Sequence, residues 1–262
     1  MDNSKITVQK EGHVLLMGLN RPEKRNAFDV DMYWGLAYAY GQLNNDPDLR
    51  CGLLYAQGDH FSAGLDLVQW APYFGEGKMP EMPAEAIDPF GLDEDNRLSK
   101  PLIMAIQGIT YTYAFELLLT SDIRVTASDL RLGQIEVKRG IYPVGGATVR
   151  MFDEIGWGNA MRYILTGDEM GAEEAYRLGL VQAITEPGKQ FDKALEFAHK
   201  VSKQAPLAVQ AALNSARIAR VQGTKPALAR LLPDLMPIMT SQDAAEGVQA
   251  FIERREANFK GY

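Results

Sequence analysis

Hydrophobic and polar residues alternate along the N-terminal part of the chain with two different periods. A period of two over residues 5–20 predicts two short strands that meet at a turn formed by Glu11 and Gly12. The period then lengthens, which predicts a helix from about residue 29 to residue 43 with Asp29 as its N-cap. We therefore expect the chain to begin with a hairpin followed by a helix.

Short, wholly apolar runs come next and predict buried strands. Residues 51–57 form one such run and lead into a loop of small residues at 58–67, and residues 101–108 form another. A helical pattern over residues 110–121 and a strand over 123–128 follow. Because strand, loop and helix recur in this order with apolar strands, the sequence predicts an α/β architecture with parallel pairing.

The chain beyond Ala172 is dominated by helical patterns separated by short Gly or Pro breaks. These patterns cover residues 172–181, 191–204, 206–223, 226–239 and 241–259. Such a tail cannot bury all its apolar faces by itself. We expect it to fold over the α/β core or over a neighbouring subunit, which favours a homo-oligomer.

Residues 73–95 interrupt this order with a segment rich in Pro, Gly, Glu and Met that has no clean period. One interpretation is a surface insertion. The other is a mobile lid whose Met and Phe side chains line an apolar pocket. The sequence leaves both open.

Composition limits which kinds of binding partner and which compartment we expect. The 262 residues carry 27 Lys and Arg against 34 Asp and Glu, a net charge of −7, which argues against nucleic acid or an anionic membrane as the main partner. Cys51, the one cysteine, lies in an apolar run, so we expect a buried structural thiol rather than a nucleophile, in a reducing compartment. The sequence requires no metal and shows neither a targeting segment nor a spanning helix, which predicts a soluble, cytoplasmic protein.

Two strand-to-helix junctions could supply backbone hydrogen-bond donors. Residues 62–65 form a small-residue loop after a strand, and residues 112–114 lie where the second helix begins. If one N–H group from each junction faces the same cavity, the pair forms an oxyanion hole, worth roughly 3 to 4 kcal/mol per donor. The alternative for the first loop is a plain turn.

Glu116 is a carboxylate inside an apolar stretch of the second predicted helix. In a structural interpretation it is a first-turn glutamate that the helix dipole favours, or it completes a capping box with Thr112. In a functional interpretation it faces the cavity of the oxyanion donors, where loss of solvent raises its pKa toward the range useful for acid–base chemistry. The pattern alone does not decide between them.

Glu136, between Ile135 and Val137, offers a second carboxylate before a Pro- and Gly-rich turn that opens another helix. Two glutamates with unlike surroundings suit a reaction that removes one proton and adds another. The alternative is a surface salt bridge with Lys138 or Arg139.

Taken together, these stretches resemble the crotonase superfamily, the enoyl-CoA hydratase/isomerase proteins. The likeness runs in order over nearly the whole chain. The stretches that carry it are NRPEKRNAF at 20–28, FSAGLDL at 61–67, KPLIMAIQG at 100–108, ELLLTSDIRVTA at 116–127, GQIEVKRGIYPVGGATVRM at 133–151, LTGDEMGAEEAYRLGLV at 165–181 and FIERREANFKGY at 251–262.

The resemblance implies a spiral of repeated ββα units with a helical C-terminal region that builds trimers, often paired into hexamers. It divides the chain into a core over residues 1–195, with the coenzyme A (CoA) site and active site, and a helical region over residues 196–262 that packs on the core and on neighbouring subunits. It also implies an acyl-CoA thioester as substrate, with CoA as part of that substrate and no bound cofactor.

The resemblance assigns roles by position. Leu65 and Tyr113 would supply the oxyanion N–H groups, and Glu116 and Glu136 would be the catalytic pair. The CoA-binding positions would be Lys24, Arg25, Ala27, Ala63, Gly64 and Asp66, with Ala63 at the adenine end and Lys24 and Arg25 near the phosphates and pantetheine.

Because both glutamates are present, the resemblance favours hydration of a 2-enoyl-CoA to a 3-hydroxyacyl-CoA. The alternatives are an isomerase, a hydrolase or carbon–carbon lyase acting on a CoA thioester or a β-diketone, and a CoA-ester-binding protein without catalysis.

One departure from the family bears on this choice. Hydratases have a run of small residues before the first glutamate, whereas this chain has Thr112, Tyr113, Ala114 and Phe115. Tyr113 either turns away from the cavity or narrows the acyl pocket, which favours a short, cyclic or aromatic acyl group over a long fatty acyl chain.

Overall fold

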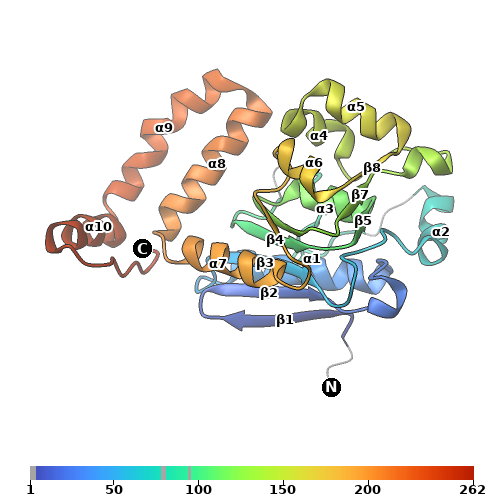
Figure 1. Cartoon of the computed structure of the whole chain (residues 1–262). Coiled ribbons are helices and arrows are strands. Elements are labelled where there is room, and N and C mark those ends of the chain that lie inside the picture. The colour runs from blue at the N-terminus through green and yellow to red at the C-terminus, as the bar shows by residue number, and fades with distance from the viewer. Residues whose placement is uncertain (1–3, 78–80, 94–95) are drawn as a thin grey trace.

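The computed structural model describes residues 4–77, 81–93 and 96–262, which form two β-sheets covered by helices (Figure 1). Within these residues the larger sheet has the strand order β1-β2-β3-β4-β6-β9 and the smaller sheet has the order β5-β7-β8. The strands are β1 (Ile6–Glu11), β2 (Val14–Leu19), β3 (Cys51–Ala56), β4 (Leu102–Ile106), β5 (Ile109–Tyr111), β6 (Ile123–Ala127), β7 (Arg131–Gly133), β8 (Glu169–Met170) and β9 (Ala183–Thr185).

The helices surround these sheets and then continue beyond them toward the C-terminus (Figure 1). The α-helices are α1 (Val30–Asn45), α2 (Leu67–Glu76), α3 (Tyr113–Thr120), α4 (Ala147–Ile155), α5 (Trp157–Thr166), α6 (Ala172–Arg177), α7 (Gln190–Ser202), α8 (Pro206–Gln222), α9 (Thr224–Met239) and α10 (Gln242–Glu253). Two short 3₁₀ helices are η1 (Pro22–Lys24) and η2 (Glu136–Arg139). Asp29 is the N-cap of α1, as predicted, and its side chain accepts a hydrogen bond from Met32 N at 3.0 Å.

The larger sheet pairs as its hydrophobic pattern predicts. All six residues of β2 are buried, and β2 pairs with β3 in parallel, Val14 opposite Cys51. The pairs β3–β4, β4–β6 and β6–β9 are also parallel, whereas β1 pairs with β2 antiparallel. Wholly apolar strands suit the middle of a sheet that is covered on both faces. The predicted α/β class with parallel pairing is confirmed.

The chain repeats a unit of one strand in each sheet followed by a helix. Strands β4 and β5 lead to α3, and β6 and β7 lead to η2. The predicted helix over residues 110–121 was therefore wrong at its start, since Ile109–Tyr111 form β5 and the helix begins at Tyr113. Parallel pairing of β5 with β7 outweighs the local helical pattern there.

Two apolar clusters lie on the two faces of the larger sheet. One includes Leu36 of α1 and Leu117 of α3. The other includes Val14, Ile103 and Ala198, the last from α7, which packs on this face. The predicted boundary between residues 195 and 196 falls within α7, and the division into two regions stays a prediction.

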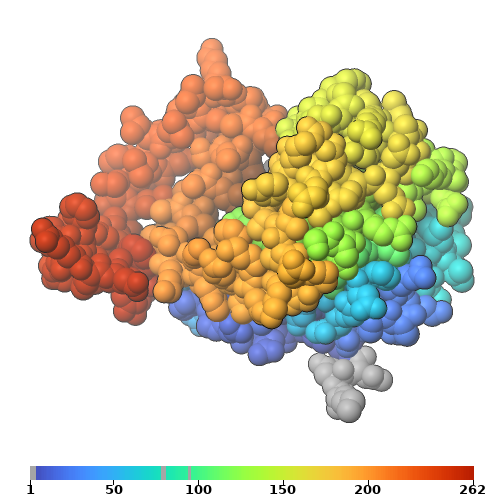
Figure 2. All heavy atoms as spheres, viewed as in Figure 1, coloured from blue at the N-terminus to red at the C-terminus, as the bar shows by residue number. Residues whose placement is uncertain are grey.

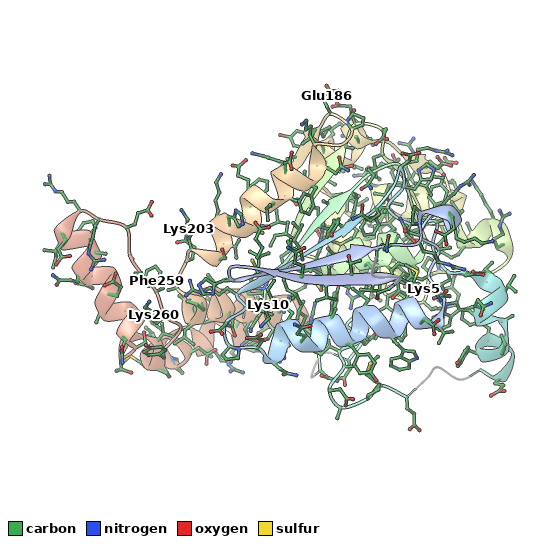
Figure 3. All side chains as sticks on the ribbon, turned by 90° about the horizontal axis from the view of Figure 1, so that it is seen from below. Lys5, Lys10, Glu186, Lys203, Phe259 and Lys260 are labelled. Carbon is green, nitrogen blue, oxygen red and sulfur yellow. The ribbon has the colours of Figure 1, made fainter. Side chains whose placement is uncertain are left out.

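The C-terminal helices extend away from the sheets. Helices α8 and α9 project side by side, and α10 follows at the end of α9 away from the turn that joins the two helices (Figure 1). The last residues return to the body, where Arg50 donates to Ser202 O at 2.8 Å and to Phe259 O at 2.6 Å. Figure 3 shows Phe259 and Lys260 of this tail near Lys203. These bonds fasten the C-terminal arm, formed by α8 and α9, to the rest of the molecule at the end of the arm next to α7.

The segment at residues 73–95 is only partly a surface feature. Residues 78–80 and 94–95 of the predicted insertion or lid lie outside the described residues. In the described part, Ala86, Ile87 and Phe90 are buried, and Met82 packs against the core. A plain surface insertion was therefore the wrong interpretation for residues 86–90.

The described residues also bear on the partners expected from composition. None of their helices is both long enough and apolar enough to cross a membrane. No group of three or more His, Cys, Asp or Glu side chains within the described ranges could hold a metal ion. Cys51 is fully buried, and burial raises the pKa of its thiol to about 12, so it is a structural thiol as predicted.

Candidate active site

The two predicted junctions lie against each other. Ser62, in the loop after β3, pairs with Thr110 of β5, and Ser62 N donates to Ile109 O at 3.0 Å. Tyr111 N donates back to Ser62 O at 3.0 Å. Gly64 has a φ of +96°, and a β-carbon at this position would overlap with Thr112 Oγ1. The loop after β3 and the start of α3 therefore meet at one point.

The Leu65 amide is a candidate donor at this point. Its neighbours are engaged within the protein, since the amides of Ala63, Gly64 and Asp66 donate to Arg25 O, Ser62 Oγ and Phe28 O. Leu65 N donates no hydrogen bond to any described residue. A plain turn does not explain why the three neighbouring amides donate hydrogen bonds while the Leu65 amide finds no acceptor among the described residues.

The Tyr113 amide is the second candidate donor. Thr112 precedes it with φ 50° and ψ −114°, a backbone conformation that strains a β-branched residue. Thr112 is held there because its N–H donates to Gly133 O at 2.9 Å. Tyr113 N, at the start of α3, has no acceptor among the described residues, and the helix dipole adds positive potential there. The strained turn thus leaves the Tyr113 amide without an acceptor in the described part of the chain.

Glu116 is buried one turn into α3, with 4% of its surface exposed. Its Oε1 accepts hydrogen bonds from Gly145 N at 2.7 Å and from Ala147 N at 3.2 Å, at the start of α4. Its pKa is raised to about 7: burial is the largest cause and the charge of Glu136 adds to it, while the two backbone donors and Arg150 act in the opposite direction. The predicted capping box was wrong, because Thr112 makes no side-chain cap and Glu116 turns to α4.

Glu136 begins η2 and is 7% exposed. Burial raises its pKa to about 7 as well. Glu136 is buried, and within the described residues neither Lys138 nor Arg139 contributes to its pKa, so the surface salt bridge was the wrong alternative. Its charge contributes to the raised pKa of Glu116, so the two carboxyl groups are close enough to interact. Their catalytic pairing stays a prediction.

Gln134 is a fully buried residue that sequence reasoning missed. With its amide nitrogen turned toward them, it donates to the Glu136 oxygens at 3.1 and 3.3 Å and to Thr112 O at 3.3 Å. It thus joins the second carboxylate to the strained turn before Tyr113. Only its place two residues before Glu136 could have suggested this contact.

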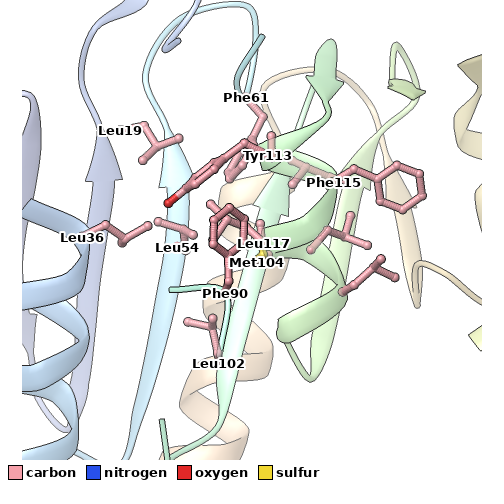
Figure 4. Close-up of a cluster of buried hydrophobic side chains, with 14 of the residues drawn as sticks. Leu19, Leu36, Leu54, Phe61, Phe90, Leu102, Met104, Tyr113, Phe115 and Leu117 are labelled. Atoms are coloured by element: carbon pink, nitrogen blue, oxygen red, sulfur yellow. The ribbon is translucent and has the colours of Figure 1, made fainter. Parts of the chain in front are cut away.

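The ring of Tyr113 lies in the apolar core. It is 2% exposed, and its centroid lies 4.4 Å from that of Phe28 and 4.5 Å from that of Phe90. Figure 4 shows it directed toward Leu19, Leu36 and Leu54. Burial raises the pKa of its phenol far above the ordinary value. The phenol is therefore neutral.

The predicted CoA loop, at residues 20–28, is fastened to the loop after β3. Asn26, which the sequence analysis did not single out, is fully buried and donates to Gln57 O and His60 O, both at 2.9 Å. Lys24 and Arg25 are exposed on this loop. Arg25 O accepts from Ala63 N at 2.9 Å, so the loop of the two cations runs beside the loop of the candidate oxyanion donor.

The remaining CoA-binding candidates lie in the same region but serve the fold. Ala27 O accepts a hydrogen bond from Arg21 at 2.8 Å. The Asp66 side chain accepts from the same guanidinium at 2.9 Å, just before α2. Arg21 thereby ties residues 20–28 to α2. Ala27 and Asp66 thus make polar contacts within the protein, and their place in CoA binding stays a prediction.

Comparison with known proteins supports what this geometry suggests. The family model for enoyl-CoA hydratase/isomerase matches residues 9–262. An enoyl-CoA hydratase of Mycobacterium tuberculosis is 36% identical over 97% of this chain and 95% of its own length. A short-chain-enoyl-CoA hydratase of Clostridium acetobutylicum is 30% identical over 98% of this chain and 97% of its own.

Comparison with solved structures leads to the same family. The crystal structure of a probable enoyl-CoA hydratase/isomerase from Mycobacterium abscessus has a TM-score of 0.95 and 44% identity, covering 100% of both chains. The predicted crotonase-type fold is therefore confirmed, while assembly into trimers stays a prediction. The family model and these relatives each cover nearly the whole chain. The chain belongs to the enoyl-CoA hydratase/isomerase family.

Proposed function

We propose that the protein adds water across the double bond of a 2-enoyl-CoA thioester and forms a 3-hydroxyacyl-CoA. The observation that carries this proposal is the pair of buried glutamates, each with a pKa raised to about 7, together with the Leu65 and Tyr113 amides, which find no acceptor among the described residues. A pair that titrates near neutrality can hold one proton and lack the other under physiological conditions.

In the proposed mechanism the thioester oxygen accepts hydrogen bonds from Leu65 N and Tyr113 N. Water loses a proton as its oxygen bonds to the β-carbon. Negative charge then moves onto the thioester oxygen, and an enolate forms. Preorganised donors stabilise such charge more than they stabilise the substrate, by roughly 3 to 4 kcal/mol each. The dipole of α3 acts in the same direction.

The surroundings of the glutamates suggest different roles. Two backbone amides donate to Glu116 and favour its ionised form, so Glu116 accepts a proton from water as the hydroxyl group bonds to the β-carbon. Among the described residues Glu136 contacts the Gln134 side chain instead of such a pair of helix amides. In this proposal Glu136 gives its proton to the α-carbon as the enolate collapses. One proton leaves water and one arrives at carbon, so the sum is the addition of one water molecule.

For the CoA part of the substrate we propose the loop at residues 20–28. The exposed cations Lys24 and Arg25 suit its phosphates and pantetheine, and Ala63 and Gly64 leave room for close approach. Ala27 and Asp66 shape the same surface through Arg21. No bound cofactor enters this proposal, since the thioester itself activates the double bond.

We also propose a homotrimer, or a dimer of trimers, in the cytoplasm. Helix α9 exposes an apolar stripe at i, i+3 and i+4 spacing, which a single copy leaves in contact with water. The stripe consists of Leu228, Leu231, Leu232, Leu235, Met236 and Met239. The compartment is inferred from the lone buried cysteine.

The proposal is tested by incubating the protein with crotonyl-CoA and following loss of the enoyl-thioester absorbance. Glu136→Gln and Glu116→Gln should each lower turnover by a factor of roughly 100 or more while CoA-ester binding persists. Glu186→Gln, at the exposed position labelled in Figure 3, is the matched control and should leave the rate unchanged.

The product separates the alternatives. Conversion of a 3-enoyl-CoA without added water would indicate an isomerase, and release of free CoA would indicate a hydrolase. Cleavage of a carbon–carbon bond would indicate a lyase. Unchanged turnover in both glutamine variants would refute the assigned chemistry, and binding of CoA esters with no product from any of them would indicate a non-catalytic protein.

A further inference from the structure

Tyr113 belongs to both the site and the core. Its amide is the proposed oxyanion donor, while its ring fills the space between α1 and the larger sheet, among Leu19, Leu36 and Leu54 (Figure 4). A side chain that starts at the reacting carbonyl and ends in the core occupies room that an acyl chain could otherwise enter. The size of this ring therefore bears directly on the substrate.

Phe90 connects that ring to Glu116. A β-carbon at Gly145 would overlap with the Phe90 ring and would lie 2.6 Å from Glu116 Oε2, so the ring lies beside the carboxylate. Phe90 in turn meets Tyr113 edge to face, with ring centroids 4.5 Å apart. The two aromatic rings therefore form a continuous wall beside Glu116, the carboxylate that the proposed function places at the β-carbon.

The wall is held in place by polar contacts behind it. Asp88 accepts hydrogen bonds from Phe90 N at 3.1 Å and from the Tyr33 hydroxyl at 3.2 Å. Arg150 is buried and donates to Gly91 O at 2.7 Å and to Gly145 O at 3.2 Å. These bonds fasten the turn that carries Phe90 to α1 and to the loop before α4. Moving Phe90 aside for a longer substrate would break them.

The Tyr113 hydroxyl is buried and has no hydrogen-bond partner among the described residues. Since it bonds to nothing there, its effect on the site is steric, and it extends the ring toward α1 and the sheet. Phe28 closes the other side of the ring, with centroids 4.4 Å apart. Packing on both sides leaves the ring no free space to turn into.

We propose that the wall formed by Tyr113 and Phe90 sets the depth of the acyl pocket and restricts the substrate to short, crotonyl-sized 2-enoyl thioesters. This inference rests on the proposed function, because it assumes that the acyl group lies between Glu116 and Glu136. Tyr113 is the specificity-determining residue: its backbone serves the reaction and its ring selects the acyl group.

The experiment compares kcat/KM for crotonyl-CoA, 2-hexenoyl-CoA, 2-octenoyl-CoA and 2-decenoyl-CoA in four proteins: the natural chain, Tyr113→Ala, Tyr113→Phe and Phe90→Ala. The natural chain should prefer crotonyl-CoA over 2-decenoyl-CoA by at least about tenfold. Tyr113→Ala should shift that ratio toward the longer substrate by at least about tenfold. Tyr113→Phe keeps the ring and should leave the ratio within about twofold of the natural value.

Phe90→Ala opens the same wall from the other side and should shift the ratio in the same direction, so the test does not depend on whether Tyr113→Ala folds. A natural chain that processes 2-decenoyl-CoA as well as crotonyl-CoA would overturn the proposal. So would folded Tyr113→Ala and Phe90→Ala variants with an unchanged ratio. A ratio changed by Tyr113→Phe would assign the selection to the hydroxyl and overturn the steric account.

Failure of the proposed function can be distinguished from failure of this inference. Butyryl-CoA and decanoyl-CoA lack the double bond, so calorimetric measurement of their binding reports the pocket without the reaction. If no enoyl thioester is hydrated, the proposed function fails. The wall is still supported if butyryl-CoA binds more tightly than decanoyl-CoA and Tyr113→Ala reverses the preference, and it is refuted if the order is the same in both proteins.

Discussion

Glu116 and Glu136 both have a pKa raised to about 7, and in each case burial is the largest cause. The charge of Glu136 also contributes to the raised pKa of Glu116. The proposed reaction needs Glu116 ionised and Glu136 protonated. We expect kcat/KM to rise with pH on an acidic limb, to peak near neutrality and to fall on an alkaline limb.

The two glutamine variants assign these limbs. In Glu116→Gln the residual activity should lack the acidic limb, because no base remains to be protonated. In Glu136→Gln the residual activity should lack the alkaline limb, because no acid remains to be lost. Stopped-flow rates across the pH range would check both, and an acidic limb that persists in Glu116→Gln would contradict the assigned base.

The same shifts predict how stability depends on pH. A carboxyl group whose pKa is about 7 in the folded state and near 4.5 in the unfolded state favours folding at low pH. That contribution is present below the unfolded value and is lost as pH rises through about 7. Above it, the folded protein carries a buried charge that the unfolded chain would expose to water.

Glu136→Gln should therefore raise the melting temperature at about pH 8 by at least about 2 °C and have little effect near pH 4, where the natural side chain is already neutral. Calorimetric melting at both pH values would check this. Glu186→Gln, at an exposed position, should show no such difference. A Glu136→Gln variant that melts earlier at the higher pH would show that the ionised carboxylate stabilises the fold.

Among the elements, the contact between the loop after β3 and the start of α3 determines whether both amides can face one carbonyl. Gly64 permits this contact because its φ is +96° and it has no β-carbon to meet Thr112. Gly64→Ala should lower kcat/KM by roughly 100-fold or more, since displacing one donor of an oxyanion hole costs about that much.

Gly140→Ala is the matched control. Gly140 also has a positive φ, of 78°, but a β-carbon there would meet no atom within 4 Å. The control therefore carries the backbone strain without the overlap, and its kcat/KM should remain close to the natural value. Equal losses in the two variants would show that strain alone, rather than the approach of the two loops, explains the effect.

Most elements could be predicted from the sequence because their signals are local. The apolar run at β3 and the cap at Asp29 lie within a few residues of the structures they specify. The start of α3 could not, because β5 depends on pairing with β7, about 20 residues further along the chain. The same holds for the site residues. Glu116 and Glu136 could be found because a carboxylate stands out in an apolar stretch. Gln134 and Phe90 could not, because their roles depend on contacts that only the fold creates.

At the scale of the whole molecule, the body and the C-terminal arm differ in how well their apolar surface is covered. The larger sheet has an apolar cluster on each face. The space-filling view shows a hollow between the arm, α8 and α9, and the rest of the molecule (Figure 2). A cleft of about 540 Å³ there is lined in part by Arg97, Arg217 and Ile218. An arm built this way contributes little burial within one copy and fits a role between copies.

The α9 stripe makes that role testable. In water its leucine and methionine side chains cost free energy that a neighbouring copy would recover, by about 25 cal/mol per Å² buried. The natural chain, of 29.0 kDa, should run in light scattering at about three or six times that mass. Leu231→Asp together with Leu232→Asp places two charges in the stripe, and the mass should fall to that of one chain.

Arg230→Asp is the control for that double variant. Arg230 lies on the same helix outside the stripe and pairs only with Asp234 at 3.2 Å among the ion pairs of the described chain. An exposed pair of this kind contributes little, so this variant should keep the mass of the natural assembly. If the natural chain is already a single copy, or if the double variant keeps the assembly intact, α9 does not form the interface. The apolar stripe would then require another partner, because six large apolar side chains in one row on a projecting helix exceed the scattered exposure of a typical monomer surface.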